Sequence, residues 1–132
     1  MQQNQIENSG LTMIGRLKIE VFGSKGELKQ VQDVPNLVVT TGKNFIASRI
    51  KDATSAVMSH MAIGDGSSVS PGTATTPAAG DTALGNEVAR VALTNTTVST
   101  NAVTYTATFP AGTPATAKSV VEAGLFNLNS GG

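Results

Sequence analysis

Apolar and polar residues alternate in several short stretches of this chain, which is the pattern of half-buried β-strands. The alternation is clearest over residues 102–109, where an apolar row (Val103, Tyr105, Ala107, Phe109) would lie opposite a row of threonines. Residues 17–22 also alternate, with Leu17, Ile19 and Val21 on one face. A Gly-Ser-Lys-Gly turn and a weaker pattern over 28–34 follow. Together these segments predict a hairpin whose second strand is bulged or lies at an edge.

Shorter apolar runs predict the remaining strands, over residues 56–63, 87–93 and 119–126, and an extended piece over 36–40. The run 56–63 also fits a helix, and its short length and the glycine that follows favour a strand. Pro35 and Asn36 are expected to interrupt the hairpin pattern. The threonine-rich stretch 94–101 is expected to be a polar connection.

One segment, residues 41–52, has the spacing of an amphipathic helix. Thr41 is the expected N-cap residue, because its hydroxyl can accept a hydrogen bond from a free amide of the first turn. Phe45, Ile46 and Ile50 are expected to face the core, and Lys51 to lie in the last turn, where the helix dipole favours a cation.

Six or seven short strands and one helix predict a mostly β fold, a β-sandwich or jelly-roll-like domain with one short α-helix. The length of 132 residues predicts a single domain, which we place over residues 14–132. Residues 1–13 are mostly Gln, Asn, Ser and Gly, and we expect a flexible N-terminal arm that orders only against a partner.

The composition favours association and excludes several function classes. Formal net charge is zero, charged residues make up 14%, and a small uncharged domain tends to associate. Without a basic patch, direct nucleic-acid binding is not expected. No stretch is long and apolar enough for a membrane-spanning helix, so no membrane partner is expected. The absence of cysteine excludes disulfides and thiolate metal sites.

A long loop over residues 64–80 is the most unusual feature of the sequence. It contains a single charge, Asp65, and no Lys or Arg, so it lacks the lysine of a phosphate-binding loop. It is either a solvated linker or an arm that lies along another protein. We favour the arm, because two prolines stiffen it and its small residues lose little entropy on ordering. Together with a second proline-containing loop over 110–116, it supplies the candidate interaction residues Gly64, Asp65, Ser70, Pro71, Thr75, Pro77, Pro110 and Pro114.

Catalytic and metal-binding constellations are weak. His60 is the single histidine, and we interpret it as structural. The Gly-Asp-Gly at 64–66 is only a fragment of a calcium loop, so Asp65 is interpreted as a turn residue that bonds nearby amides. Glu87 and Glu122 could converge as paired carboxylates, but coincidence explains them equally. We therefore expect no enzyme activity, no cofactor and no metal.

Several segments resemble a family of small virion structural proteins from tailed bacteriophages. They are N36-L-V-V-T-T-G-K-N-F-I-A-S-R49, V57-M-S-H-M-A-I-G64, D81-T-A-L-G85 with E87-V-A-R-V-A-L93, V103-T-Y-T-A-T-F-P-A-G112 and E122-A-G-L-F-N127. The resemblance runs from about residue 14 to the end of the chain. It implies a structural role and no reaction, and it implies a chain that continues past Gly132 with a further strand or two.

Resemblance and size together suggest a capsid cement, or decoration, protein. Such a protein would bind the major capsid protein and copies of itself, as a dimer or trimer, on the capsid exterior of a virion assembled in the host cytoplasm. The alternative is a tail-fibre or baseplate component. A carbohydrate-binding module is a third hypothesis, and the few aromatic residues argue against it.

Overall fold

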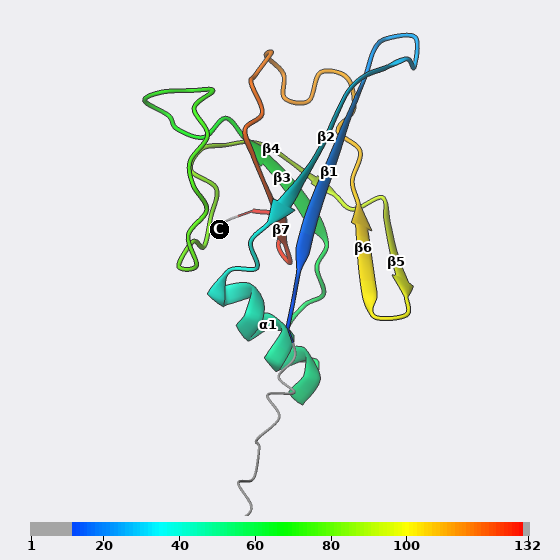
Figure 1. The fold of residues 1–132 in the computed structure, drawn as a ribbon, viewed down its shortest axis with the longest axis vertical. Helices are drawn as coiled ribbons and strands as arrows, with labels where there is room; N and C mark the ends of the chain where they lie inside the picture. The colour runs from blue at the N-terminus through cyan, green and yellow to red at the C-terminus, as the bar shows by residue number, and fades with distance from the viewer. Residues whose placement is uncertain (1–11, 131–132) are drawn as a thin grey trace, which may run out of the picture. The chain divides into compact units, whose positions relative to one another are not determined.

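The computed structural model describes residues 12–130, so most of the arm expected over 1–13 lies outside the described residues. By their contacts, the residues cluster into two compact units, Met1–Val38 and Val39–Gly132, which are treated separately below. The elements in chain order are β1 (Gly15–Phe22), β2 (Leu28–Asn36), α1 (Thr40–Lys51), β3 (His60–Gly64), β4 (Glu87–Ala92), β5 (Asn95–Ser99), β6 (Ala102–Thr106) and β7 (Glu122–Phe126) (Figure 1). The single domain expected over 14–132 stays a prediction.

The described part of the first unit is the predicted hairpin, in which β1 and β2 pair antiparallel. Residues that lie opposite one another share a face of the hairpin. Leu17 lies opposite Val34 on the apolar face, while Lys18 lies opposite Asp33 on the polar face. On the polar face Arg16 pairs with Asp33 at 2.8 Å, and Lys18 pairs with Glu20 at 2.6 Å.

The second strand of the hairpin is irregular, as its weak pattern predicted. The register shifts between Val21 and Phe22, whose partners are Gln30 and Leu28, so Lys29 is the extra residue of a bulge. Pro35 was expected to interrupt the strand, and that expectation was wrong: β2 continues through Pro35 to Asn36. Proline is tolerated there because a two-stranded sheet has only edge strands.

The second unit contains a three-stranded antiparallel sheet in which β3 lies between β4 and β7 (Figure 1). Ala62, at the centre of β3, has no exposed surface and lies between Arg90 and Gly124. A Cβ atom at Gly124 would lie 2.8 Å from the Phe126 ring, so the small residue is required there. The guanidinium of Arg90 stacks over that ring at 3.9 Å. Small side chains and one stacked arginine therefore line one face of this sheet at its middle, while Met61, Val91 and Leu125 on the other face are half-buried.

A second hairpin, formed by β5 and β6, makes a separate two-stranded sheet. The prediction that residues 94–101 form a polar connection was wrong, because Asn95–Ser99 is a strand. Its threonines and valine have high β-propensity, and pairing with the cleanly alternating β6 determines their conformation. Strand β6 itself ends at Thr106, earlier than the pattern suggested. Likewise β3 begins only at His60 and β7 only at Glu122.

Helix α1 forms where predicted, but two details of the prediction were wrong. Its N-cap residue is Val39, which makes no side-chain capping bond, so Thr41 is already inside the helix. The Thr41 hydroxyl instead lies 3.5 Å from the carbonyl oxygen of Asp81. Ile50 was expected to face the core and is 74% exposed, whereas Phe45 and Ile46 are half-buried.

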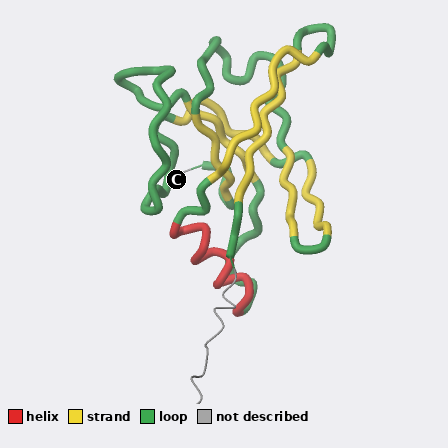
Figure 2. The backbone as a smooth tube through the Cα atoms, in the orientation of Figure 1, coloured by secondary structure: helices red, strands yellow, loops and turns green. Residues whose placement is uncertain are grey.

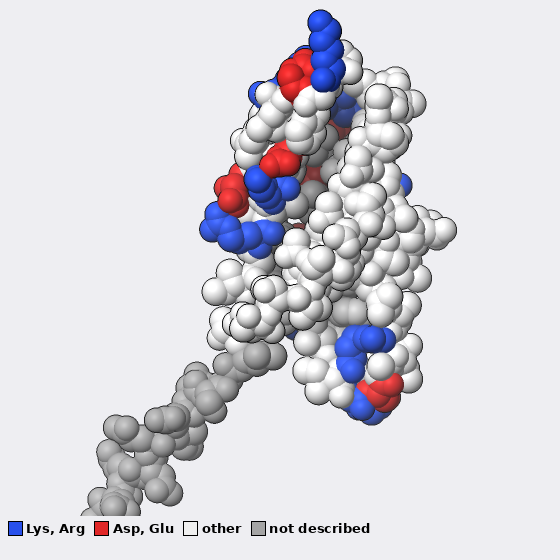
Figure 3. Space-filling model, turned by 90° about the vertical axis from the view of Figure 1, so that its right-hand side faces the viewer, with Lys and Arg blue, Asp and Glu red and all other residues white. Residues whose placement is uncertain are grey.

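Little apolar surface is buried within residues 12–130. Ala62 is the one buried hydrophobic residue among them, and fourteen large hydrophobic residues are exposed. The face shown in Figure 3 has a broad area without charged side chains. The mostly β class with one short helix is confirmed. The strands form small antiparallel sheets joined by long loops (Figure 2), and the sandwich or jelly-roll arrangement stays a prediction.

The residue after the helix C-cap provides a test of this local geometry. Ala53 has a φ of 56°, in the left-handed region that costs a residue with a Cβ about 1 kcal/mol relative to glycine. We expect Ala53→Gly to leave the structure unchanged and to raise the free energy of unfolding by up to about 1 kcal/mol. The control Ala47→Gly, inside the helix, should lower it by about 1 kcal/mol. Urea unfolding of both variants measures the difference, and a destabilised Ala53→Gly would contradict the assigned conformation.

Candidate interaction site

Glu122, the first residue of β7, joins three segments of the second unit. Its carboxylate accepts hydrogen bonds from the backbone amides of Gly66 (3.2 Å), Gly85 (2.9 Å) and Asn86 (2.9 Å). The backbones of Gly66 and Gly85 lie so close together here that a Cβ atom at Gly85 would collide with the carbonyl oxygen of Gly66. Gly66 also has a φ of 88°, which favours glycine. One carboxylate therefore holds the start of the long loop and the segment that follows the loop against β7.

Asp65 lies beside this carboxylate and is completely buried. Its Oδ1 accepts a hydrogen bond of 2.5 Å from the side-chain amide of Asn86, and its Oδ2 lies 3.3 Å from the Lys118 ammonium. The prediction that Asp65 bonds nearby amides was therefore wrong: its side chain bonds groups that are distant in the sequence. The lysine offsets the cost of burying this charge.

The long loop begins inside this buried corner. Gly64 ends β3 and is buried, as are Asp65 and Gly66. The carbonyl of Asp65 accepts a 2.7 Å bond from the amide of Gly72, and the carbonyl of Ala79 accepts a 2.8 Å bond from the amide of Thr40. The loop is thus attached at its root and again at the N-terminus of α1. Only the residues between Gly72 and Ala79 therefore remain as the candidate arm.

Four of the predicted interaction residues lie in or beside that stretch: Ser70, Pro71, Thr75 and Pro77 are all exposed. Val69 beside them is 90% exposed and is the one branched aliphatic residue of the loop. Gly64 and Asp65, in contrast, are buried and cannot contact a partner directly. Whether the exposed residues bind a partner stays a prediction.

The second predicted loop is also a defined turn. The carbonyl of Pro110 accepts a 3.0 Å bond from the amide of Thr113, and Gly112 has a φ of 82°. Pro110 is exposed, while Pro114, which follows a cis peptide bond, is half-buried. No hydrogen bond or ion pair of the described residues joins this loop to the exposed part of loop 64–80.

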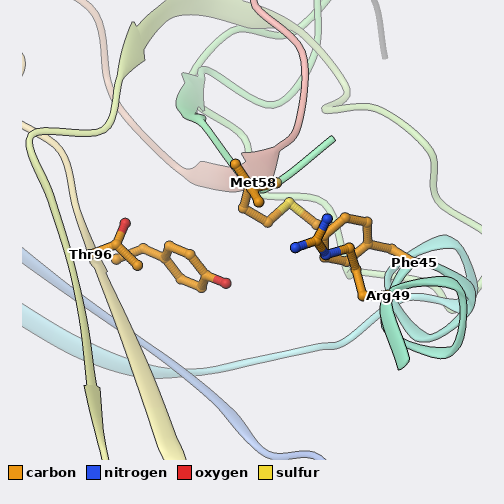
Figure 4. Close-up of a pocket in the computed structure, with 6 residues that line it drawn as sticks. Phe45, Arg49, Met58 and Thr96 are labelled. Carbon is orange, nitrogen blue, oxygen red and sulfur yellow. The ribbon is translucent and has the colours of Figure 1, made fainter. Parts of the chain in front are cut away.

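An apolar groove that the sequence did not reveal lies between α1 and the β5–β6 hairpin. It has a volume of about 420 Å³ and is lined by Phe45, Arg49, Val57, Met58, Thr96 and Tyr105. Figure 4 shows Phe45 and Arg49 extending from the helix, with Thr96 on the opposite wall and Met58 between them. Arg49 donates bonds to the carbonyls of Ala53 and Ser55, which direct its charge toward the helix end. The remaining lining is mostly apolar, so the groove suits a nonpolar side chain of another protein.

The residues considered for chemistry have structural partners. The ring Nδ1 of His60 lies 2.8 Å from the Ser59 hydroxyl, in agreement with a structural histidine. Glu87 and Glu122 both lie opposite Gly64 in the strands on either side of it. Each carboxylate has partners of its own: Glu87 makes a two-pronged ion pair with Arg90, at 2.9 and 2.7 Å, and Glu122 binds the three backbone amides. The part of the chain described here has no cluster of three or more metal-ligating His, Cys, Asp or Glu side chains. It also contains no helix of the length and apolarity that crossing a membrane requires.

Sequence reasoning considered Glu122 only as one of a carboxylate pair, and it missed both the bonds of Glu122 to backbone amides and the groove. An acid at the start of a strand, with glycines at 64, 66 and 85 elsewhere in the chain, is a signal that could have suggested a carboxylate bound by backbone amides. The groove has no such signal, since Tyr105 and Phe45 have the ordinary spacing of core residues.

Comparison with known proteins identifies the family. Residues 32–113, more than half of the chain, match the family described as phage tail-collar fibre protein, N-terminal. The chain belongs to this family and is a phage virion structural protein. The match covers the helix, the long loop and the groove, and it favours the tail-fibre alternative over the capsid cement role. The capsid exterior and the major capsid protein partner are not supported by it. No curated protein and no solved structure matches the chain.

The Glu122 carboxylate provides the test of this site. In Glu122→Gln, one acceptor oxygen becomes an amide donor, and at least one backbone amide loses its partner. We expect the free energy of unfolding to fall by about 2–3 kcal/mol. The matched control is Asp81→Asn, because Asp81 accepts a single exposed bond from the amide of Ala78, and its loss should cost less than about 1 kcal/mol. Equal unfolding midpoints for the two variants would show that Glu122 does not hold the loop.

Proposed function

We propose that this chain is a structural module of a phage tail-collar fibre, which joins the fibre to neighbouring tail proteins by surface contact. The family match over residues 32–113 is the observation that carries this proposal. The apolar groove and the exposed stretch of loop 64–80 lie within the matched residues, and they are the surfaces we assign to these contacts. The chain acts by binding and carries out no reaction.

The burial pattern supports a role in assembly. A soluble monomer rarely leaves a contiguous apolar surface uncovered, and uncovered apolar surfaces often mark protein contacts. Here Val57 at the groove is 58% exposed, and Val98 and Val103, which lie opposite one another on β5 and β6, are 74% and 50% exposed. Thr96 and Tyr105 share the face of these valines, because they lie two residues along each strand. The apolar surface therefore continues from the groove along one face of the second hairpin.

Location on the particle tests the proposal directly. Gold-labelled antibody or electron cryomicroscopy of the phage should place the chain at the tail. Its copy number should be a few tens at most, on the order of the symmetry-related positions there. Hundreds of copies spread over the capsid shell would instead support the cement role and refute ours.

Adjacent residues of β5 allow a matched test of the groove. Thr96 lines the groove, while Thr97 points to the other face of the hairpin, and both are exposed. We expect Thr96→Asp to fold normally but to reduce incorporation into phage about tenfold, because a charge would have to be desolvated against apolar neighbours. Thr97→Asp should be incorporated as well as the wild-type chain. Quantitative immunoblots of purified particles measure both, and equal incorporation would exclude the groove as a contact surface.

A further inference from the structure

The open edge of β1 is the clearest unpaired backbone surface in the described residues. Strand β1 pairs with β2 on one side only, in a sheet of two strands. It runs for eight residues, Gly15–Phe22, without proline and without an extra residue of its own. An edge of this kind presents unpaired amides and carbonyls that can pair with another strand.

The other edge of the hairpin is protected. The bulge at Lys29 disrupts regular pairing along β2, and Pro35 has no amide hydrogen to donate. Bulges and prolines are common devices that prevent edge-to-edge pairing. The asymmetry makes β1 the strand that is available for pairing.

Further strands would stabilise the hairpin. A two-stranded hairpin is only marginally stable by itself in water. Its apolar face carries Leu17, Ile19 and Val21 from β1, of which Leu17 and Ile19 are half-buried and Val21 is 43% exposed. Pairing with further strands would add hydrogen bonds and would widen this face into a surface large enough to be stable.

The sequence of β1 is complementary to itself. If two copies of Leu-Lys-Ile-Glu-Val, residues 17–21, run antiparallel with Ile19 opposite Ile19 of the other copy, then Lys18 lies opposite Glu20 and Leu17 lies opposite Val21. Both charged pairs are attractive, and both lie on the polar face. The apolar residues of the two copies would form one stripe on the other face. Direct cross-strand pairs of opposite charge and of apolar residues stabilise a sheet, and like charges destabilise it.

We propose that β1 pairs antiparallel with β1 of a second copy of this chain, across a two-fold axis at Ile19. The two hairpins form a continuous four-stranded sheet in the order β2-β1-β1-β2. Lys18 forms an ion pair with Glu20 of its own strand and lies opposite Asp33 of β2. In the pair of copies, Lys18 therefore lies between Asp33 of its own chain and Glu20 of the other copy, so opposite charges alternate across the sheet. The contact is isologous, so each copy supplies the same residues. It does not depend on where the chain lies in the virion.

Cysteine cross-linking tests the register, because the natural chain contains no cysteine. Directly opposed residues of antiparallel strands have Cα atoms about 4.5–5.5 Å apart, within the range that a disulfide requires. Ile19→Cys should therefore form a disulfide-linked dimer under mild oxidation. Lys18→Cys mixed with Glu20→Cys should cross-link to each other, and each alone should cross-link poorly, because identical positions other than 19 are offset along the strands. Strong cross-linking of Lys18→Cys with itself would refute the register.

Charge reversal tests the same contact without cysteine. Glu20→Lys places a second ammonium group against Lys18 of the other copy. Within its own hairpin it removes the ion pair with Lys18, while its cross-strand neighbour there is the uncharged Val31. We expect the substitution to weaken self-association about tenfold in sedimentation or light scattering, with an unchanged circular dichroism spectrum. Lys18→Glu should weaken it too, but a mixture of the two variants should form heterodimers, since opposite charges then face one another again at both positions. A wild-type chain that stays monomeric, or a Glu20→Lys chain that associates as well as wild type, would overturn the proposal.

Discussion

The carboxylate of Glu122 accepts backbone hydrogen bonds from Gly66, Gly85 and Asn86, and the shape of the second unit depends on this contact. It brings together the root of loop 64–80, the segment before β4 and the start of β7. Asp65 is buried beside it, with Lys118 near its free oxygen. A charged acceptor makes stronger hydrogen bonds than a neutral one, so a polar cluster can do here what a larger apolar core does in other small domains.

Because the second unit has a polar cluster and little fully buried apolar core, many large hydrophobic side chains remain at the surface. At the centre of the three-stranded sheet, Ala62, Gly124 and the Arg90–Phe126 stack lie on one face, and Met61, Val91 and Leu125 on the other face are only half-buried. Many of the exposed large hydrophobic side chains lie on the β1–β2 hairpin, at the groove and on the β5–β6 hairpin. Membership of the tail-collar fibre family gives this distribution a purpose, because a chain that works within a virion can bury such surfaces against its neighbours.

The sequence predicted local structure well where the pattern was independent of distant partners. The alternation in 17–22 and the spacing in 41–52 determined β1 and α1, because each depends on its own periodicity. It failed for Asn95–Ser99, whose conformation depends on pairing with β6, and for Pro35, which an edge strand tolerates. The fold class was accessible for the same reason: many short alternating runs and one helical run define it.

The candidate site was harder to predict, because it depends on contacts between distant residues. Ser70, Pro71, Thr75 and Pro77, which the composition of the long loop marked as interaction residues, are exposed, and their role stays a prediction. Nothing local showed that Asp65 would be buried against Asn86 and Lys118. The groove joins α1 to β5 and β6, which lie far apart in the sequence, and no motif reports such a contact. The resemblance to phage virion proteins was confirmed, and the family match favours the tail over the capsid.

If neighbouring proteins in the virion cover the apolar surfaces of this chain, a side-chain-resolution reconstruction of the phage tail will show those neighbours directly. We expect the groove around Tyr105 and the edge of β1 at Ile19 to be buried against other chains. A reconstruction in which both surfaces face solvent, in a chain that is otherwise fully ordered, would contradict this claim.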